Sequence, residues 1–217
     1  AQADSAPMVA VTGQVPVAMI GKDAFQESDI IGMANPVVKY SFQPRLPGEV
    51  PEAVRKGFYI AETGRPGPVL LDIPKDVQQN EAPMDFPDEF TIQGYHPWND
   101  PDVASVQKAV DMLVNSERPI ILAGGGTIIS SAFAELQSVA ETLMIPVVTT
   151  FKGKGAFPEN HPLSLGPIGM HGHAEANKMM AESDCVLAIG TRFSDRSVGT
   201  FEAFEKRLKI IHMDVDP

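Results

Sequence analysis

The stretch from Gly166 to Gly199, GPIGMHGHAEANKMMAESDCVLAIGTRFSDRSVG, decides the fold class that we expect for this chain. Its residue types predict a loop at 169–173, a helix at 174–182, an apolar strand at 185–189 and a second loop. A helix that returns antiparallel to the strand brings both loops to one edge of a parallel sheet. That edge is the carboxyl edge, where open α/β sheets bind ligands.

The second loop carries Arg192, Asp195 and Arg196. Together with the glycines and the start of the helix, the two arginines suit an anionic ligand such as a diphosphate. The alternative is a surface ion pair with Asp195, which would contribute little energy.

Three further apolar runs, at residues 119–123, 145–149 and 209–213, predict strands that flank this stretch. The strands end in the loops AGGG, TTFKGKG, TRFSDR and DVDP. Alternating helices and buried strands predict an α/β fold, a doubly wound parallel sheet with helices on both faces. Together with GMHGH, five loops then meet at one edge and form a binding crevice.

Two helices are expected in this second half. One starts at Pro101 with Asp100 as its cap, and the other is capped by Ser130 or Ser131. Their predicted core faces are Val103, Val106, Val110 and Leu113 in the first, and Phe133, Leu136, Ala140 and Leu143 in the second.

In the first half, residues 7–12 predict a buried parallel strand, and residues 69–73 predict a second strand. We expect a long loop with a short helix near Ala24, a strand at 37–42, and a helix at 47–63 that Gly64 stops. The apolar face of that helix is predicted at Val50, Val54, Phe58 and Ile60 or Ala61.

Three segments follow from the composition along the chain. Residues 1–80 form a first domain, residues 81–100 form a proline-rich acidic linker, and residues 101–217 form a second domain. The first residue is Ala1 rather than methionine, and the chain stops directly after an apolar strand, so we expect a fragment of a longer polypeptide.

The composition excludes several classes of function. The 217 residues carry a formal net charge of −11, which argues against passive binding to nucleic acid or to an anionic membrane. No apolar run approaches the ~20 residues that span a bilayer. The single cysteine, Cys185, lies in an apolar strand and is expected to be a core thiol, in a protein of the reducing cytoplasm.

Several motifs leave two interpretations open. Gly124, Gly125 and Gly126 supply only part of a dinucleotide fingerprint, since Ile129 occupies the third glycine position, so a simple tight turn competes. Asp214 is placed to accept from a ribose hydroxyl, and a helix cap is its competitor. His171 and His173 lack metal-ligand spacing, so no metal site is expected.

The motifs VTGQVP, GKDAFQE, TGRPGPVLLDIPKDV, AGGG, GPIGMHGH, GTRFSDR and HMDVDP occur in this order over essentially the whole chain. This series resembles the catalytic subunits of the acetohydroxyacid synthase (acetolactate synthase) family. The resemblance implies a thiamine-diphosphate enzyme that also binds FAD. It implies that residues 1–80 are the C-terminal half of the pyrimidine-binding domain. Residues 101–217 are then a Rossmann-like FAD-binding central domain, truncated at its C-terminus.

The resemblance also assigns roles to residues. FAD contacts would be Arg65, Gly124, Gly125, Gly126, Thr150, Phe151, His171, Gly172, Gly190, Thr191, Arg192, Asp214 and Val215. Phe25 and Gln26 would face thiamine diphosphate from a neighbouring subunit. The substrate channel would be lined by Lys75, Met170, Asp195 and Arg196, with Lys75 and Arg196 acting on the substrate.

The implied reaction condenses pyruvate with pyruvate or 2-ketobutyrate, with loss of CO₂, in branched-chain amino-acid biosynthesis. The thiazolium ylid does the carbon chemistry, and FAD looks structural because no electrons are transferred overall. The family's ylid-activating glutamate and its GDG…N motif for Mg²⁺ and the diphosphate are absent from this sequence; Glu27 is not that glutamate. The 217 residues alone are therefore expected to be inactive. Dimers or tetramers with sites between chains, and a small regulatory subunit, are the implied partners.

Three alternatives remain. The first is another FAD-containing thiamine enzyme, such as pyruvate oxidase, glyoxylate carboligase or sulfoacetaldehyde acetyltransferase. A pure nucleotide-binding module would explain the second domain, but it would not need the first 80 residues. A folded interaction fragment with an empty crevice is the third.

Overall fold

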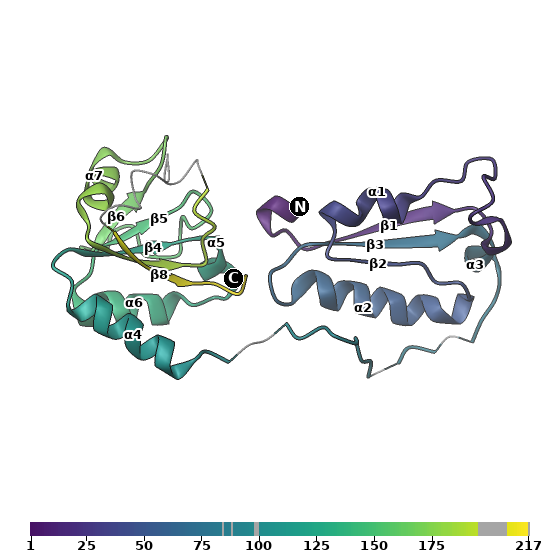
Figure 1. The fold of residues 1–217 in the computed structure, drawn as a ribbon, viewed down its shortest axis with the longest axis horizontal. Helices are drawn as coiled ribbons and strands as arrows, with labels where there is room; N and C mark the ends of the chain where they lie inside the picture. The colour runs from purple at the N-terminus through teal and green to yellow at the C-terminus, as the bar shows by residue number, and fades with distance from the viewer. Residues whose placement is uncertain (84, 88, 98–99, 195–207, 217) are drawn as a thin grey trace. The chain divides into compact units, whose positions relative to one another are not determined.

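The computed structural model describes residues 1–83, 85–87, 89–97, 100–194 and 208–216. Apart from the last two residues, the chain divides into two compact units, Ala1–Asn99 and Asp100–Val215. Each unit contains one parallel sheet, as expected for this α/β sequence (Figure 1). None of the helices in the described ranges is long and apolar enough to cross a membrane.

Unit 1 is built on a three-stranded parallel sheet in the order β1-β3-β2. The strands are β1 (Met8–Gln14), β2 (Tyr40–Phe42) and β3 (Pro68–Pro74). The α-helices of the unit are α1 (Ile30–Ala34), α2 (Val50–Glu62) and α3 (Lys75–Gln79), and α1 and α2 lie on opposite sides of the sheet in Figure 1. Four 3-10 turns complete it: η1 (Gln2–Asp4), η2 (Val17–Met19), η3 (Asn35–Val37) and η4 (Pro47–Glu49).

The strand expected at residues 69–73 is present as the buried central strand β3, but β1, which was expected to be buried, is not. It pairs with β3 on one side only, and Val11 is 64% exposed. The prediction of a buried strand at residues 7–12 was wrong because an apolar run does not distinguish a central strand from an edge strand. The helix expected near Ala24 also lies elsewhere: α1 begins at Ile30, and Asp29 caps it by accepting from Gly32 N.

The buried face of α2 agrees with the predicted one at Ile60 and Ala61 and differs from it elsewhere. Phe58 is exposed, and the residues that face the sheet are Ala53, Gly57, Ile60 and Ala61. A Cβ on Gly57 would lie 3.5 Å from a methyl group of Leu71, so small residues allow the helix to approach β3 closely. The apolar pattern missed this face because close packing required small side chains rather than large ones.

The proline-rich segment after α3 contains no helix or strand in its described residues, and it packs on unit 1 through aromatic rings. Tyr95 contacts Tyr59 edge to face at 6.1 Å between ring centres. Its hydroxyl lies 3.0 Å from the carbonyl oxygen of Thr63 and 3.2 Å from Lys39 Nζ. The Lys39 ammonium also donates to Thr63 O at 2.7 Å, so it bonds the carbonyls at the carboxyl end of α2.

Unit 2 is built on a five-stranded parallel sheet in the order β6-β5-β4-β7-β8. Its strands are β4 (Pro119–Ala123), β5 (Val147–Thr149), β6 (Ser164–Pro167), β7 (Cys185–Ile189) and β8 (Lys209–Met213). Numbered within the unit the order is 3-2-1-4-5, which is the Rossmann order for five strands. Its helices are α4 (Val103–Val114), α5 (Gly125–Ile129), α6 (Phe133–Leu143) and α7 (Ala174–Glu182).

Two hydrophobic cores cover the two faces of this sheet. Ile121 and Ala123 of β4 face the core that includes Leu113 of α4 and Leu136 of α6. The alternate residues Ile120 and Leu122 face the core that includes Met180 of α7. This alternation along one strand is what helices on both faces require.

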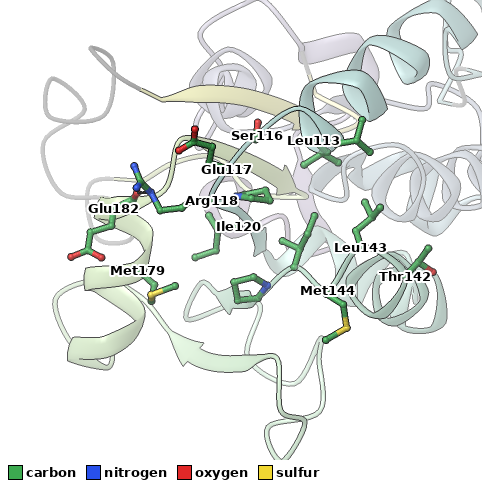
Figure 2. A pocket seen from close by; sticks show the side chains of 14 residues that line it. Leu113, Ser116, Glu117, Arg118, Ile120, Thr142, Leu143, Met144, Met179 and Glu182 are labelled. Carbon is green, nitrogen blue, oxygen red and sulfur yellow. Dashed lines mark hydrogen bonds between the residues drawn. The ribbon is translucent and has the colours of Figure 1, made fainter.

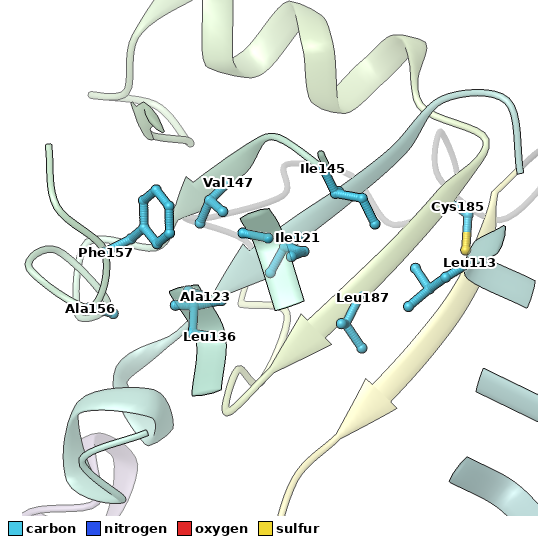
Figure 3. Close-up of a cluster of buried hydrophobic side chains, with 11 residues drawn as sticks. Leu113, Ile121, Ala123, Leu136, Ile145, Val147, Ala156, Phe157, Cys185 and Leu187 are labelled. Atoms are coloured by element: carbon cyan, nitrogen blue, oxygen red, sulfur yellow. The ribbon is translucent and has the colours of Figure 1, made fainter. Parts of the chain in front are cut away.

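Cys185 belongs to the first core, with Leu113 and Leu187 (Figure 3). It is fully buried, and burial raises the pKa of its thiol. The expectation of a core thiol is confirmed.

The caps predicted for the helices of unit 2 were wrong, and the predicted faces were right only in part: Leu113, Leu136 and Ala140 are buried as expected, whereas Phe133 and Leu143 are exposed. Asp102 rather than Asp100 caps α4, because its carboxylate accepts from the amides of Ala104 and Ser105. Val103 is 80% exposed, Val106 and Val110 are also exposed, and only Leu113 of the predicted stripe is buried. Ala132 occupies the cap position of α6, and Leu136 and Ala140 are its buried residues.

Candidate functional site

The strand order of unit 2 reverses at β4, whose neighbours β5 and β7 are reached in opposite directions along the sheet. In open α/β sheets the crevice outside such a reversal point binds ligands. Here the loops after β4 and β7 meet at the carboxyl edge, beginning at Gly124 and Gly190. Most of the residues predicted for the flavin follow the strands of this edge. His171 and Gly172 follow β6, Thr150 and Phe151 follow β5, and Asp214 and Val215 follow β8.

The glycines of the two central loops are required by their close packing. Gly124 N donates to Ile189 O at 2.8 Å, and Gly126 N donates to Gly190 O at 2.9 Å. A Cβ on Gly124 would lie 2.2 Å from Gly190 O, and a Cβ on Gly190 would lie 2.5 Å from Gly126 Cα. Loop-to-loop packing therefore explains these positions, and Gly124 also precedes the short helix α5.

The loop after β5 presents one aromatic side chain at this edge. Thr150 is buried, donates through its amide to Ala123 O at 3.0 Å, and accepts from Gly153 N at 3.0 Å through its hydroxyl. Phe151, the next residue, is 82% exposed. A buried threonine thus fixes the backbone from which an exposed phenyl ring projects.

The GMHGH loop lies at the carboxyl edge, as the sequence predicted, and follows β6, a strand that was not predicted. Ile168 N donates to Thr149 O at 2.9 Å, which joins the two strand ends. Asn177 of α7 holds the loop in both directions: its Oδ1 accepts from Gly169 N at 2.9 Å and its Nδ2 donates to Gly169 O at 3.0 Å. Met170 and His171 are exposed on the loop.

The loop after β7 is held to β8 by a histidine. His212 Nε2 lies 2.9 Å from Thr191 O and 3.7 Å from Asp214 Oδ2. Its ring contacts Phe193 at 5.3 Å between centres. Thr191 is buried and Arg192 is exposed, so the guanidinium is available to a ligand at this edge. Asp195 and Arg196 lie outside the described residues.

In unit 1, the predicted catalytic residues also belong to a carboxyl edge. Phe25 and Gln26 lie in the loop between β1 and α1, and Lys75 is the first residue after β3. Phe25 is 89% exposed, and Gln26 has a positive φ of 66°. Arg65 is separate from these residues: it lies between α2 and β3, at the amino edge, where its Nε donates to Ser5 Oγ at 3.0 Å.

Below the exposed loop, the ends of all three strands of unit 1 are joined by a buried carboxylate. Asp72 of β3 accepts from Thr12 Oγ1 at 2.8 Å, from Gln14 Nε2 at 3.2 Å and from Gln43 Nε2 at 2.9 Å. Gln14 Nε2 also donates to Ser28 O at 2.8 Å, in the loop that carries Phe25. This network fixes the edge on which the loop stands.

A hollow of about 610 Å³ lies at the opposite, amino edge of unit 2 (Figure 2). It is lined mainly by apolar residues such as Leu113, Ile120 and Met144. Its polar groups are used within the protein: the amides of Glu117 and Arg118 donate to the Asp184 carboxylate at 2.9 Å, and Arg118 Nε donates to Glu182 O. We therefore place the candidate site at the carboxyl edge, where the exposed groups and loops are.

Among the described residues there is no group of three or more histidine, cysteine or acidic side chains that could hold a metal ion.

Four supporting residues were not identified from the sequence: Glu27, Asp72, Asn177 and His212. Each acts through backbone groups or polar partners that the fold brings near, as Asn177 does eight residues after Gly169. Glu27, Asp72 and His212 lie within the motifs GKDAFQE, TGRPGPVLLDIPKDV and HMDVDP, but the motifs alone did not indicate a supporting role, and Asn177 lies in none of them.

The chain is similar to known proteins along its whole length. Residues 106–217 match the model of the thiamine pyrophosphate enzyme central domain. The chain is 50% identical to the "Probable acetolactate synthase large subunit" of Methanocaldococcus jannaschii over 100% of its length and 37% of the relative. It is 45% identical to the acetolactate synthase large subunit of Corynebacterium glutamicum, again over 100% of its length and 35% of the relative.

The corresponding protein of Mycobacterium tuberculosis is 43% identical, with the same coverage of 100% and 35%. The chain thus spans just over a third of the length of the curated relatives that it matches. With the Rossmann order of its second sheet and a family match over more than half of its residues, this chain belongs to the thiamine pyrophosphate enzyme family.

Proposed function

We propose that this chain is a segment of an acetolactate synthase large subunit, which condenses pyruvate with pyruvate or 2-ketobutyrate and releases CO₂. The observation that carries the proposal is that identity to such subunits, 43–50%, extends over both units of the chain. A pure nucleotide-binding module would need only the second unit. The extent of the similarity therefore favours the synthase over that alternative, and branched-chain amino-acid biosynthesis is the proposed context.

In this proposal, residues 1–80 are the C-terminal half of the pyrimidine-binding domain, residues 81–100 are a linker, and residues 101–217 are a truncated FAD-binding domain. The enzyme is cytoplasmic and oligomeric, with sites between subunits and a small regulatory subunit. The proposed partners are small 2-keto acids, and the net charge of −11 argues against nucleic acid or an anionic membrane as a partner.

The chemistry of the carboxyl edge fits FAD. The exposed Arg192 would bind the diphosphate, and Asp214 would accept from a ribose hydroxyl. The exposed Phe151 and Met170 offer apolar contact to a ring system. Arg65, Gly124–Gly126, Thr150, His171–Gly172, Gly190–Thr191 and Val215 complete the proposed set. The Gly124 and Gly126 amides already donate within the protein, so their part would be to let the loops approach closely.

Thiamine diphosphate, held with Mg²⁺ mainly by other parts of the subunit, would supply the carbon nucleophile that takes up pyruvate. Phe25 and Gln26 are exposed on the loop of unit 1 and would contact it and the reacting carbon from a neighbouring subunit. Gln26 would orient the acceptor by hydrogen bonding, while Lys75 and Arg196 would bind carboxylates. Met170 and Asp195 would line the channel through which the keto acids enter.

The test is an assay of the full-length subunit in which this segment lies, supplied with pyruvate, thiamine diphosphate, Mg²⁺ and FAD. We expect acetolactate and CO₂ in equal amounts, and a flavin that stays bound through gel filtration. Oxygen consumption with peroxide formation would instead identify a pyruvate oxidase. Carboligation only with glyoxylate would identify a glyoxylate carboligase, and acetyl transfer only from sulfoacetaldehyde would identify a sulfoacetaldehyde acetyltransferase. Failure to bind FAD at micromolar concentration would rule out the proposed site.

A further inference from the structure

The loop between β1 and α1 of unit 1, residues 15–29, is held by polar bonds rather than by a hydrophobic core. None of its residues is fully buried, yet its conformation is specific. Near its start, Val17 N donates to the Asp76 carboxylate at 3.1 and 3.2 Å. Near its end, Gln14 Nε2 donates to Ser28 O at 2.8 Å. The central part, which carries Phe25 and Gln26, needs a separate support.

That support comes from Glu27. Its Oε1 accepts from Gly21 N, and its Oε2 accepts from Ala24 N at 2.9 Å and from Lys22 N at 3.3 Å. A single carboxylate thus binds the backbone amides that curl around it. These bonds favour the charged form and lower the pKa of Glu27, with the bond from Gly21 as the largest cause.

Phe25 and Gln26 are the two central residues of a β-turn. Glu27 N donates to Ala24 O at 2.9 Å, which closes the turn, while Ala24 N donates back to the Glu27 side chain. Gln26 has a φ of 66°, as the third position of a type II turn requires. Glycine or asparagine usually occupies that position because other side chains are strained there.

The strain has to be offset by the surroundings. Asp23, three residues earlier, also has a positive φ, of 54°. Two such residues in a short exposed loop persist only where other contacts over-determine the backbone, and such positions gather at functional sites. The bonds from Gly21 and Ala24 to the Glu27 carboxylate hold the backbone on both sides of Asp23, and the bond from Ala24 also joins the two ends of the turn that contains Gln26. These bonds are therefore the natural source of the stabilisation.

We propose that Glu27 is a positioning residue that folds Gly21–Ala24 around its carboxylate and so presents Phe25 and Gln26 in a fixed turn. It does not need to touch substrate or cofactor. The functional consequence rests on the proposed function, in which Gln26 orients the acceptor 2-keto acid.

The structural test is backbone amide hydrogen exchange, measured by NMR on the isotopically labelled chain. Glu27→Gln keeps the size of the side chain but replaces one accepting oxygen with an NH₂ group, which repels the amides. We expect several-fold faster exchange at Gly21, Lys22 and Ala24, with changed shifts at Phe25 and Gln26. Glu62→Gln, at the exposed end of α2, is the matched control and should change none of them.

A rescue experiment separates loss of the Glu27 bonds that hold the turn from a general destabilisation of the fold. Gln26→Gly removes the strain at the turn because glycine adopts a positive φ readily. In the Glu27→Gln background it should slow exchange at the amide of residue 27, which closes the turn by donating to Ala24 O. Unchanged exchange in Glu27→Gln would overturn the proposal, as would an equal effect of Glu62→Gln.

The functional test uses the full-length synthase proposed above. There, Glu27→Gln should lower kcat/KM for carboligation while the bound FAD and the affinity for a regulatory subunit remain unchanged. If the unaltered full-length protein makes no acetolactate, the proposed function fails, and the exchange experiment still decides the role of Glu27. If the protein is active and Glu27→Gln changes exchange but not kcat/KM, Glu27 shapes the loop without positioning it for catalysis, which contradicts the proposal.

Discussion

The amide of Gly126 donates to the carbonyl of Gly190 at 2.9 Å, across the loops that end β4 and β7. These loops meet where the strand order of unit 2 reverses. Gly190 has a φ of +57°, and a Cβ there would lie 2.5 Å from Gly126 Cα. The crevice therefore depends on two backbones that touch with no side chain between them.

Gly190→Ala is expected to destabilise unit 2 by about 2 kcal/mol or more. The left-handed conformation alone costs ~1–2 kcal/mol for a residue with a Cβ, and the contact with Gly126 adds to that cost. Urea-induced unfolding followed by circular dichroism measures the effect. Gly155→Ala is the matched control, because Gly155 has a φ of +92° but a Cβ there would meet no described atom within 4 Å. An equal loss in both variants would mean that the loop contact contributes nothing.

Cys185 should be protected from thiol reagents while the chain is folded. The side chain is fully buried in the core that includes Leu113 and Leu187, and burial raises the pKa of the thiol, so little thiolate forms. We expect reaction with Ellman's reagent to be slow in buffer and fast in concentrated urea, with one thiol per chain. Native labelling as fast as labelling in urea would contradict the packing shown in Figure 3.

The accuracy of the sequence predictions differed with the kind of element. β4, β7, β8 and α7 were predicted with their observed bounds. For β4 and β7 the reason is that buried parallel strands are continuous apolar runs between clear breaks. β6, SLGP, was missed. It has one large apolar residue, and pairing with β5, across an irregular register, stabilises it as a strand. Such pairing is a tertiary effect that local sequence does not contain.

The location of the candidate site was easier to predict than its supports. The carboxyl edge follows from the alternation of helices and strands alone. Asn177 and Glu27 act on backbone groups, and any of several polar residues could have done so in another fold. The face of α2 was predicted only in part for a related reason, since Ala53 and Gly57 are buried because they are small.

Asp184 is expected to stabilise unit 2 in a pH-dependent way. Its carboxylate accepts from Glu117 N and Arg118 N at 2.9 Å, and its pKa is lowered, chiefly by the bond from Glu117. A lowered pKa in the folded state means that the stabilisation is present above the unfolded value, about 3.9, and is lost as the pH falls through the folded value.

The corresponding experiment compares Asp184→Asn with the unaltered chain between pH 7 and pH 3. At neutral pH we expect the variant to be less stable by about 1 kcal/mol, and the difference should shrink below about pH 4. Asp85→Asn, an exposed site with the same change of charge, is the control. A difference that stays constant down to pH 3 would show that ionisation of Asp184 is not the cause.

Asn177 is expected to govern the GMHGH loop, and through it the proposed flavin site. Its amide accepts from Gly169 N and donates to Gly169 O, which fixes the glycine at a φ of +105° just before Met170 and His171. Asn177→Asp keeps the acceptor but loses the donor and repels Gly169 O, whereas Asn177→Leu loses both bonds. Amide exchange at Gly169 should rise in both variants.

A control substitution elsewhere on α7 separates an effect on the position of the loop from an effect on the stability of the helix. Lys178→Met, one residue along the helix and well exposed, should leave Gly169 exchange and flavin affinity unchanged. For the Asn177 variants we expect FAD affinity, measured by flavin fluorescence titration of the full-length subunit, to fall about tenfold, as the loss of about 1.4 kcal/mol from one held loop would produce. Faster exchange with unchanged flavin affinity would mean that the loop does not contact FAD. His171 would then have to be removed from the proposed site, while the clamp on Gly169 would stand.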